Sequence, residues 1–589
     1  MQTEPVTECV DLGSFEQLQA EGRLTGKLGA LPVLVVVDGV ELAAIEDRCP
    51  HLGFPLHRGT VHDGMITCHW HHARFDLASG CALDPWADDA AAFDASVDAD
   101  GRVVVSSRRP VDPLERWQRR LRDGLEHELP LVLAKSVHAL VELPGGAQRA
   151  LSEAFEFGDR NRAEGWGSGM TVVTCMANLL PHLQAGDQPA ALIHALTFLA
   201  RDVRGHAPRF GQPPMVAAGQ TSDRLMGWYR AFVETRNADG AERALATAVE
   251  GGDLATIERS MFATLTDHVY VDGGHSLDFT NKAFEAVGHV GSRHAAMLTS
   301  LVMQTCQAER SEETSEWQHP HDLVTLGDSA KRHLAELDLV DAIGGIDVAR
   351  LGWALLSDDP AEVVTALLAA ADDGAALEEL ARAVAFAGAL RLVRFHTNND
   401  PGDWDTVHHT FTFANAVHQA VVRRPSPAIV RGVVDGALRV YLDRFLNVPA
   451  ARLPGATKAT ETISETTTAT TTTARLDDLA ACWNIQGAVD QAGIAVWGAL
   501  GAGTSRSDVI VALGHALLQE DAGFHWYQSI EAGVRQALAW PEGSDEAALV
   551  LVGVARFLAA HTPTRRELAT ITRTAVRLRR GESTFEDDT

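Results

Sequence analysis

Two short segments of the chain each pair a cysteine with a histidine at a fixed spacing. The first reads Cys49-x-His51, the second reads Cys68-x-x-His71, and sixteen residues separate His51 from Cys68. One thiolate and one imidazole from each segment could bind an iron–sulfur cluster, with two cysteines on one iron and two histidines on the other. The same four side chains could bind a single zinc ion in a tetrahedral arrangement, whatever the surrounding fold. The spacing therefore predicts a metal centre with these four residues as ligands.

The sequence around the two segments resembles the Rieske [2Fe–2S] ferredoxin domain. The resemblance covers residues 1–108 and continues through GTVHDGMITCHWHHARFDLASG, which contains the second segment. It implies a Rieske [2Fe–2S] cluster held by the four predicted ligands. Rieske domains of the high-potential respiratory type have a disulfide between their ligand loops, and Phe54 and Trp70 occupy the corresponding positions here. The resemblance is thus to the oxygenase and ferredoxin branch, with a reduction potential near the lower end of the Rieske range of about −150 to +300 mV.

Short strands and turns are expected to position these ligands. Segments such as LPVLVVV, MITCHW and RVVVSS are separated by Gly or Asp turn signals, which predicts a small all-β domain over residues 1–108. Ala- and Leu-rich segments at helical period then predict a large all-α, oxygenase-like domain over residues 112–455 that continues over 476–580. Residues 456–475 are Thr-rich and are predicted to form a flexible surface loop. The expected fold class is multidomain, with a small all-β domain followed by a large all-α domain.

Several histidines of the helical region lie in separate apolar segments. The segments are AALIHALTFLA with His194, GHSLDF with His275, HHTFTFANAV with His409, and EDAGFH with His525. A single buried imidazole can be satisfied by a backbone carbonyl. Imidazoles from several helices can instead share a metal ion, which offsets the cost of removing them from water.

The pattern GHSLDFTNKAFEAV, HHTFTFANAV and EDAGFH resembles the questin oxidase-like family, helical oxygenases of aromatic polyketide metabolism with a His-rich non-haem iron site. The resemblance spans much of the helical region. It implies that His275, His409 and His525 are metal ligands, with His194 as a further candidate. No lysine ligand can be placed, and Lys282 is expected to lie at the surface.

These features together predict an oxidoreductase. A reductase or ferredoxin would donate electrons to the Rieske cluster through His51 or His71, and the cluster would pass them to the non-haem iron, where O2 would oxidise a small organic, aromatic substrate. The Asp-x-x-His-x-x-x-x-His motif of mononuclear iron oxygenases is absent, and no catalytic residue is assigned. Two alternatives remain open. The chain could be a Rieske electron-transfer protein whose helical domain docks onto a larger redox complex, or a redox sensor with a helical interaction module.

Composition excludes several other classes. The 589 residues carry a formal net charge of −29, which repels a phosphate backbone and disfavours nucleic acid and anionic membrane surfaces as partners. The N-terminus lacks the basic and apolar regions of a signal peptide, and no run reaches the ~18 apolar residues of a spanning helix. Seven scattered cysteines fit a reducing compartment. A cytoplasmic protein without a membrane partner is expected.

Overall fold

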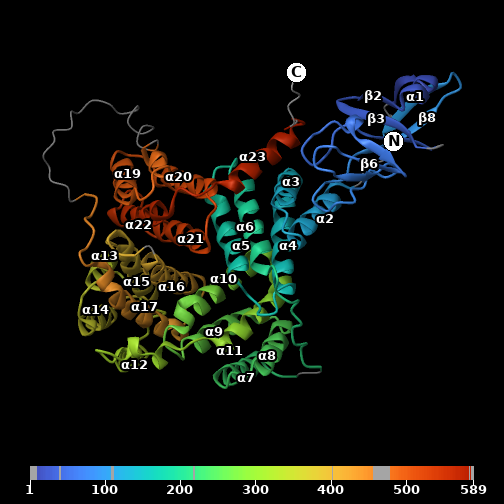
Figure 1. The fold of residues 1–589 in the computed structure, drawn as a ribbon. Coiled ribbons are helices and arrows are strands. Elements are labelled where there is room, and N and C mark those ends of the chain that lie inside the picture. The colour runs from blue at the N-terminus through green and yellow to red at the C-terminus, as the bar shows by residue number, and fades with distance from the viewer. Residues whose placement is uncertain are drawn as a thin grey trace, which may run out of the picture. The chain divides into compact units, whose positions relative to one another are not determined.

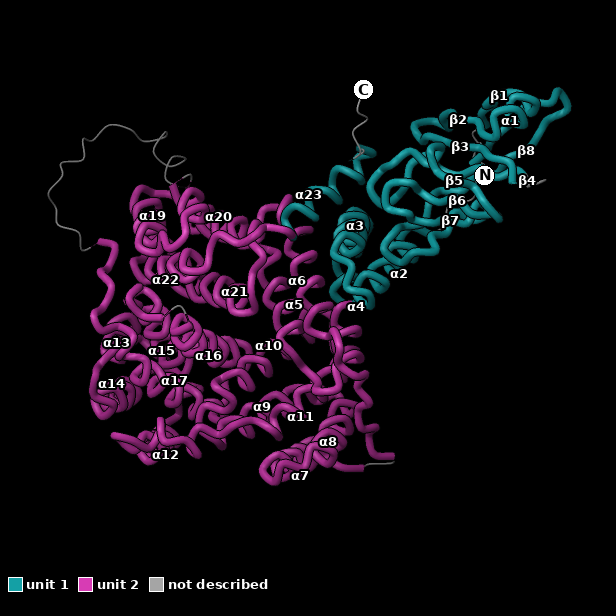
Figure 2. Tube along the Cα trace, viewed as in Figure 1, with its two compact units in different colours: residues 1–153, 568–589 teal, residues 154–567 magenta. Residues whose placement is uncertain are grey.

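The structure is a computed structural model, and the chain divides into two compact units. Unit 1 comprises residues 1–153 and 568–589, and unit 2 comprises residues 154–567 (Figure 2). The described residues are 9–38, 41–107, 112–216, 219–400, 402–455, 476, 478–582 and 584. The Thr-rich loop predicted over 456–475 lies outside them.

Unit 1 contains two antiparallel sheets, with strand orders β1-β9-β8-β4-β3-β2 and β5-β6-β7 (Figure 1). The strands are β1 (Cys9–Ser14), β2 (Arg23–Leu28), β3 (Leu31–Asp38), β4 (Glu41–Glu46), β5 (Thr60–His62), β6 (Met65–Thr67), β7 (Arg74–Asp76), β8 (Ala92–Val97) and β9 (Arg102–Ser107). One short helix, α1 (Phe15–Glu21), is added to them and is capped by the Ser14 side chain. The predicted N-terminal β domain is confirmed.

The apolar run in β3 separates two cores. Because successive side chains of a strand point to opposite faces, Leu34 and Val36 enter the core that contains both ligand cysteines, whereas Val33 and Val35 enter the other core. All four residues are buried. A strand that is covered on both faces explains why this segment reads as continuous hydrophobic sequence and not as an alternating pattern.

Unit 1 extends beyond the β domain expected over 1–108. It also includes α2 (Pro113–Glu126), α3 (Pro130–Val141), part of α4 (Gly146–Arg160) and residues 568–579 of α23 (Glu567–Arg579). Buried ion pairs join the first two helices to the β domain, because Asp88 accepts from Arg120 of α2 at 3.1 Å and from Lys135 of α3 at 3.0 Å. The composition change near residue 110 marks the transition from strands to helices. The ion pairs explain why the compact unit continues beyond this point and includes α2 and α3.

The described residues of unit 2 form helices joined by turns and loops, without strands, which confirms the predicted helical region. Its longer elements are α5 (Ser168–Leu179), α6 (Gln188–Val203), α7 (Ser222–Glu234), α8 (Ala238–Glu250), α9 (Leu254–Leu265), α10 (His275–Val290), α11 (Val302–Gln307), α12 (Leu323–Leu334), α13 (Val348–Ala354), α14 (Pro360–Asp372), α15 (Leu377–Val393), α16 (Asp403–Arg423), α17 (Val430–Leu442), α19 (Val489–Gly501), α20 (Arg506–Gln519), α21 (Phe524–Leu538) and α22 (Asp545–His561). Helix α15 is buried along almost its whole length, because α16 and α22 pack against it. None of the described helices is both long and apolar enough to cross a bilayer.

Lys282 lies in the core of unit 2, and the prediction that it lies at the surface is wrong. Its side chain is 1% exposed, and its Nζ donates to Glu285 Oε2 at 3.0 Å and to Glu531 Oε2 at 2.7 Å. Burial by itself lowers the pKa of this lysine, but the two carboxylates outweigh burial and leave the pKa raised. The lysine is therefore charged, and two carboxylates from α10 and α21 compensate the cost of burying it.

Replacement of the buried lysine should destabilise the protein strongly. Lys282→Met removes the buried cation between Glu285 and Glu531 and leaves the partly exposed Arg535 as a cation beside both of them. Loss of one partner of a buried pair costs about 3–5 kcal/mol. Urea unfolding followed by far-ultraviolet circular dichroism should show the lower midpoint. The triple variant Lys282→Met, Glu285→Gln, Glu531→Gln should recover part of the loss. An unchanged midpoint for Lys282→Met would contradict the role of this ion pair in the core.

Candidate metal centres

Two loops of similar design present the predicted ligands in unit 1. One follows β4 and the other follows β6. In the first loop the Gly53 N–H donates to the Cys49 carbonyl at 2.8 Å, and in the second the His72 N–H donates to the Cys68 carbonyl at 3.0 Å. Gly53 and His72 close these turns with φ of 90° and 64°, a region that glycine adopts freely and that histidine tolerates better than most side chains.

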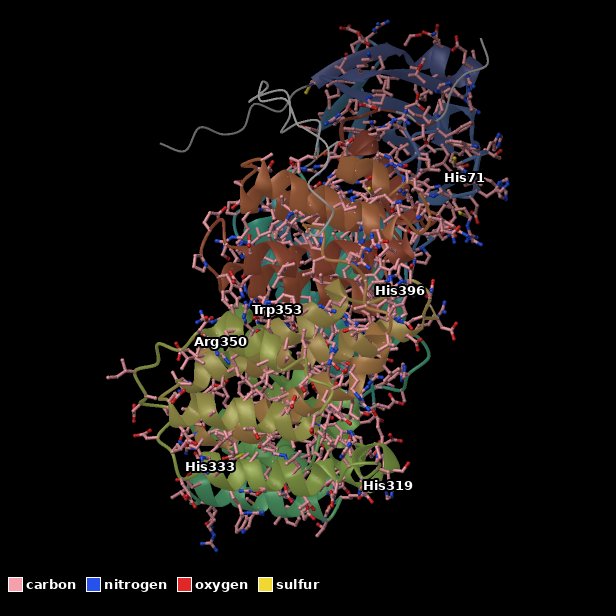
Figure 3. All side chains as sticks on the ribbon, turned by 90° about the vertical axis from the view of Figure 1, so that its left-hand side faces the viewer. His71, His319, His333, Arg350, Trp353 and His396 are labelled. Atoms are coloured by element: carbon pink, nitrogen blue, oxygen red, sulfur yellow. The ribbon has the colours of Figure 1, made fainter. Side chains whose placement is uncertain are left out.

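The four predicted ligand residues lie together at the tips of these loops. Cys49 and Cys68 are buried and free of disulfides, and the rings of His51 and His71 have centroids 4.9 Å apart. His51 is half-buried, whereas His71 is exposed (Figure 3). Electrons can therefore enter or leave most directly on the His71 side.

Electrostatics favour the iron-binding forms of Cys68 and His51. The hydrogen bond between the two thiols lowers the pKa of Cys68 to about 6 and raises the pKa of Cys49. Burial, followed by the charges of Lys135 and His71, lowers the pKa of His51 to about 4. A neutral imidazole and an easily formed thiolate are the states in which these groups coordinate metals.

The residues present fit a [2Fe–2S] cluster. The His51 Nδ1 atom is buried and has no hydrogen-bond partner within the described part of the chain. Burying a polar atom without a partner costs free energy, and coordination to a metal would offset that cost. The donor set is two thiols and two imidazoles, as a Rieske cluster requires. Phe54 and Trp70 pack with ring centroids 6.3 Å apart, so an aromatic contact lies where the respiratory type has its disulfide.

Comparison with known proteins agrees with this geometry. Residues 8–94 match the family model of the Rieske [2Fe-2S] domain. Over 84 residues, the chain is 32% identical to apoptosis-inducing factor 3 of Mus musculus and 33% identical to that of Homo sapiens. Each alignment covers 14% of this chain and 14% of the relative, so the chain spans only a small part of the length of the curated relatives it matches.

Solved structures also match a part of the chain. A complex of reduced oxygenase and oxidised ferredoxin in carbazole 1,9a-dioxygenase is 22% identical, covers 18% of this chain and 98% of its own, and has a TM-score of 0.17. The ferredoxin of carbazole 1,9a-dioxygenase from Nocardioides aromaticivorans IC177 is 27% identical, with coverages of 17% and 98% and a TM-score of 0.16. The family match by itself shows that residues 8–94 form a Rieske domain, an electron-transfer module whose presence implies a [2Fe–2S] cluster.

Three of the predicted histidine ligands lie next to one another in unit 2. His275 is the first residue of α10, His409 lies in the second turn of α16, and His525 is the second residue of α21. Ring centroids are 4.6 Å apart for His275 and His409, 4.7 Å for His409 and His525, and 6.0 Å for His275 and His525. We call these residues the three-histidine cluster. The fully buried ring of His408 lies 4.8 Å from His525.

The rings of the three-histidine cluster are neutral near pH 7. Burial, followed by the neighbouring rings, lowers the pKa of His275 to about 4 and that of His409 to about 3. Burial also lowers the pKa of His525. The His409 Nε2 atom is buried and has no hydrogen-bond partner among the described residues. As placed, no three His, Cys, Asp or Glu side chains in the described ranges enclose a single ion.

Asp405 and three phenylalanines surround this cluster. Asp405 precedes His409 by one helical turn, and its charge partly offsets the lowering of the pKa of His525 by burial. The ring centroid of Phe524 lies 6.0 Å from that of His275. Phe279 and Phe198 continue the aromatic wall, with centroids 6.0 Å and 6.5 Å from that of Phe524. The Asp-x-x-x-His spacing in the sequence could have identified Asp405 as a neighbour of His409. The aromatic wall, formed by Phe198, Phe279 and Phe524, depends on tertiary packing and has no such signal.

His194 does not belong to the three-histidine cluster, so its prediction as a further ligand is corrected. Both of its ring nitrogens have hydrogen-bond partners: Nδ1 lies 2.9 Å from the Tyr527 hydroxyl, and Nε2 lies 3.2 Å from the Leu518 carbonyl. The ring is buried, and burial lowers its pKa to about 4. A neutral histidine with both nitrogens engaged is a satisfied core residue and has no nitrogen to give to a metal.

A surface cavity of about 500 Å³ lies elsewhere in unit 2. Its wall includes His396, Arg452, Asp490 and Arg556, and no member of the three-histidine cluster lines it. Figure 3 labels His396, which follows α15 in the sequence. The Arg556 guanidinium pairs with Asp490 and donates to the Phe395 carbonyl at 2.8 Å, so this cation serves packing between helices.

Loss of a cluster ligand should abolish the Rieske signal. Reduced protein should give the electron paramagnetic resonance spectrum of a His-ligated [2Fe–2S] centre, and Cys49→Ser or His71→Ala should eliminate it because each removes an iron ligand. His69→Ala is the matched control, since exposed His69 contacts Thr60 Oγ1 at 2.6 Å and is not a predicted ligand. A spectrum typical of four cysteine ligands, or a colourless zinc protein, would contradict the assignment.

Acid should destabilise the metal-free protein through its buried histidines. His275 and His409 are neutral when folded, with pKa values of about 4 and 3, but bind protons below about pH 6.5 when unfolded. The unfolded state therefore binds more protons than the folded state as the pH falls from 6.5 toward the folded pKa values. Over that range, each ring lowers the free energy of unfolding by about 1.4 kcal/mol for each unit of pKa shift. Thermal unfolding between pH 7 and pH 4 should show the loss, and His409→Gln, which cannot titrate, should show less of it. Because burial raises the pKa of Asp278 to about 7 and gives a change of opposite sign over this range, the comparison of the two proteins decides: the same pH dependence in wild-type and His409→Gln proteins would contradict the shift at His409.

Proposed function

We propose that the protein is an oxidoreductase in which the Rieske cluster of unit 1 supplies electrons to a non-haem iron bound by His275, His409 and His525 in unit 2. The reaction is the O2-dependent oxidation of an aromatic substrate. The observation that carries the proposal is the convergence of three imidazoles from three helices, with ring centroids 4.6–6.0 Å apart. Bound iron would supply the redox chemistry that activates O2.

The protonation state of the rings supports metal binding. A cation near these rings would be repelled if they were protonated, and their lowered pKa values keep them neutral over the physiological range. Among the described residues, the buried His409 Nε2 atom has no hydrogen-bond partner for its lone pair or proton. Coordination would satisfy it, provided that the partly exposed rings of His275 and His525 turn toward the same point.

Asp405 adds a carboxylate to the imidazoles that would bind the iron. Two or three imidazoles with one carboxylate are typical of non-haem iron(II) sites that keep open positions for substrate or O2. Asp405 is half-buried on the same face of α16 as His409, and its charge acts on His525. Its negative charge would also lower the net charge of the iron-bound site, which would make burial of the ion less costly.

The aromatic wall supports an aromatic substrate. Phe198, Phe279 and Phe524 are all half-buried, so part of each ring is open to a ligand beside the three-histidine cluster. Aromatic side chains bind flat apolar rings by offset or edge-to-face contact, worth about 0.5–1.5 kcal/mol for each pair beyond area burial. These residues would bind and orient the substrate and keep water from the reacting centre.

Buried polar side chains continue inward from the three-histidine cluster. The His525 Nδ1 atom lies 3.2 Å from Gln528 Oε1, and the Gln528 amide donates to Asp278 Oδ2. Asp278 is 2% exposed, and burial raises its pKa to about 7. A carboxyl group that exchanges a proton near neutral pH, one hydrogen-bonded residue away from His525, could hold or release a proton during the oxidation.

The alternative is electron transfer without catalysis. A Rieske domain alone performs that task, and exposed His71 would serve either a donor or an acceptor protein. Docking, however, requires no buried histidines. The three-histidine cluster and its unpartnered nitrogen therefore favour the oxygenase proposal, with a reductase or ferredoxin as the external electron donor.

Iron analysis decides between these functions. Well-loaded protein should contain more iron than acid-labile sulfide, because a Rieske cluster holds two of each and the second site adds iron alone. His275→Ala and His409→Ala should remove the excess iron and leave the Rieske signal intact, since they alter only unit 2. His194→Gln is the matched control, because it changes a buried histidine whose nitrogens are both engaged, and it should keep the excess iron.

Equal amounts of iron and sulfide, with no other bound transition metal, would contradict the oxygenase proposal and favour electron transfer. Loss of excess iron in the His194→Gln protein as well as in the other two would show that the loss reflects packing and not ligation.

A further inference from the structure

A buried lysine from outside the Rieske domain contacts the first cluster loop. Lys135 lies on α3, beyond the matched residues 8–94, and its side chain is 8% exposed. Its Nζ donates to the Pro50 carbonyl at 2.6 Å and to the His51 carbonyl at 3.0 Å, and it pairs with Asp88 Oδ2 at 3.0 Å. An ammonium group has three protons, and these three acceptors satisfy all of them.

A second cation from α2 holds the same carboxylate. Arg120 Nε donates to Asp88 Oδ1 at 3.1 Å, and its Nη2 donates to the carbonyls of Pro85 and Ala87 at 3.0 Å and 3.1 Å. Asp88 is 4% exposed and Arg120 is 6% exposed, so the arrangement is shielded from water. The ring of Trp86, in the same segment, lies with its centroid 4.8 Å from that of His51. Helices α2 and α3 therefore fix the segment that covers His51.

We propose that Lys135 is a positioning and tuning residue of the Rieske centre, which holds the Cys49-x-His51 loop in place and raises the reduction potential of the cluster. The functional electron-transfer module then comprises the β domain together with α2 and α3. The inference rests on the Rieske domain and not on the iron proposed for unit 2.

The sign of the effect follows from charge. Reduction adds one negative charge to the centre, and a nearby buried cation stabilises that charge more strongly than a solvated cation would. The positive charge of Lys135 lies in contact with the backbone carbonyl of His51, a predicted ligand residue. Asp88 pairs with Lys135 and places a negative charge next to that positive charge. Loss of Lys135 should lower the potential, and loss of the Asp88 charge should raise it.

Potentiometric titration of the intact protein tests this pair of opposite shifts. Lys135→Met should lower the potential, with a fall in the equilibrium constant for reduction of about tenfold, the size expected when one partly shielded charge near a redox centre is removed. Asp88→Asn should shift the potential upward. Lys27→Met, which removes the same charge from an exposed position on β2, should leave the potential unchanged because water screens that charge.

The spectrum of the reduced cluster, recorded for every variant, shows whether the centre is intact. The Lys135→Met protein should also release its cluster faster on incubation with a chelator, because the first cluster loop loses the hydrogen bonds from Lys135. Equal potentials in wild-type, Lys135→Met and Asp88→Asn proteins, or shifts of the same sign in both variants, would overturn the tuning role and leave only packing. If Lys135→Met cannot hold a cluster, the direction of the Asp88→Asn shift alone decides: an upward shift supports the proposal and a downward or absent shift refutes it.

Discussion

An imidazole that leaves water must keep both ring nitrogens satisfied, and this constraint separates the histidines of this protein into two groups. His194 meets it with a tyrosine hydroxyl and a backbone carbonyl, and so serves the core. His51, His138 and His409 each have a buried ring nitrogen without a partner among the described residues, and the rings of His51 and His409 also lie beside another histidine. For His51 and His409, whose rings are also kept neutral by burial, we propose a metal ion as the missing partner.

The same constraint organises the polar interior of each unit. In unit 1, Lys135 and Arg120 are buried, and their donors are accepted by Asp88, Asp123 and backbone carbonyls. This arrangement joins two helices to a cluster loop. In unit 2, Lys282 is buried because Glu285 and Glu531 flank it. In both places the charged groups come from different elements. Buried charge therefore fixes how the elements pack as well as which chemistry they can support.

Local patterns in the sequence predict much of this arrangement. The Cys49 and Cys68 segments are short enough that spacing alone identifies the ligands, and the apolar periodicity distinguishes the β domain from the helices. From the sequence, His275, His409 and His525 are grouped through the resemblance of their three segments to the questin oxidase-like family. The sequence does not reveal that Tyr527 satisfies His194, that two carboxylates draw Lys282 inside, or that Lys135 reaches the cluster loop. Those outcomes depend on contacts between residues far apart in the chain, which periodicity does not encode.

The central claim is that one chain combines a Rieske cluster with a separate histidine-bound iron. Mössbauer spectroscopy of isotopically enriched protein tests it most directly, because each iron environment contributes its own signal in proportion to its amount. The account predicts a high-spin iron environment with half the total area of the two cluster irons, and this third signal should be missing from the His409→Ala protein. A spectrum that contains the two cluster irons alone in fully loaded protein would contradict the account.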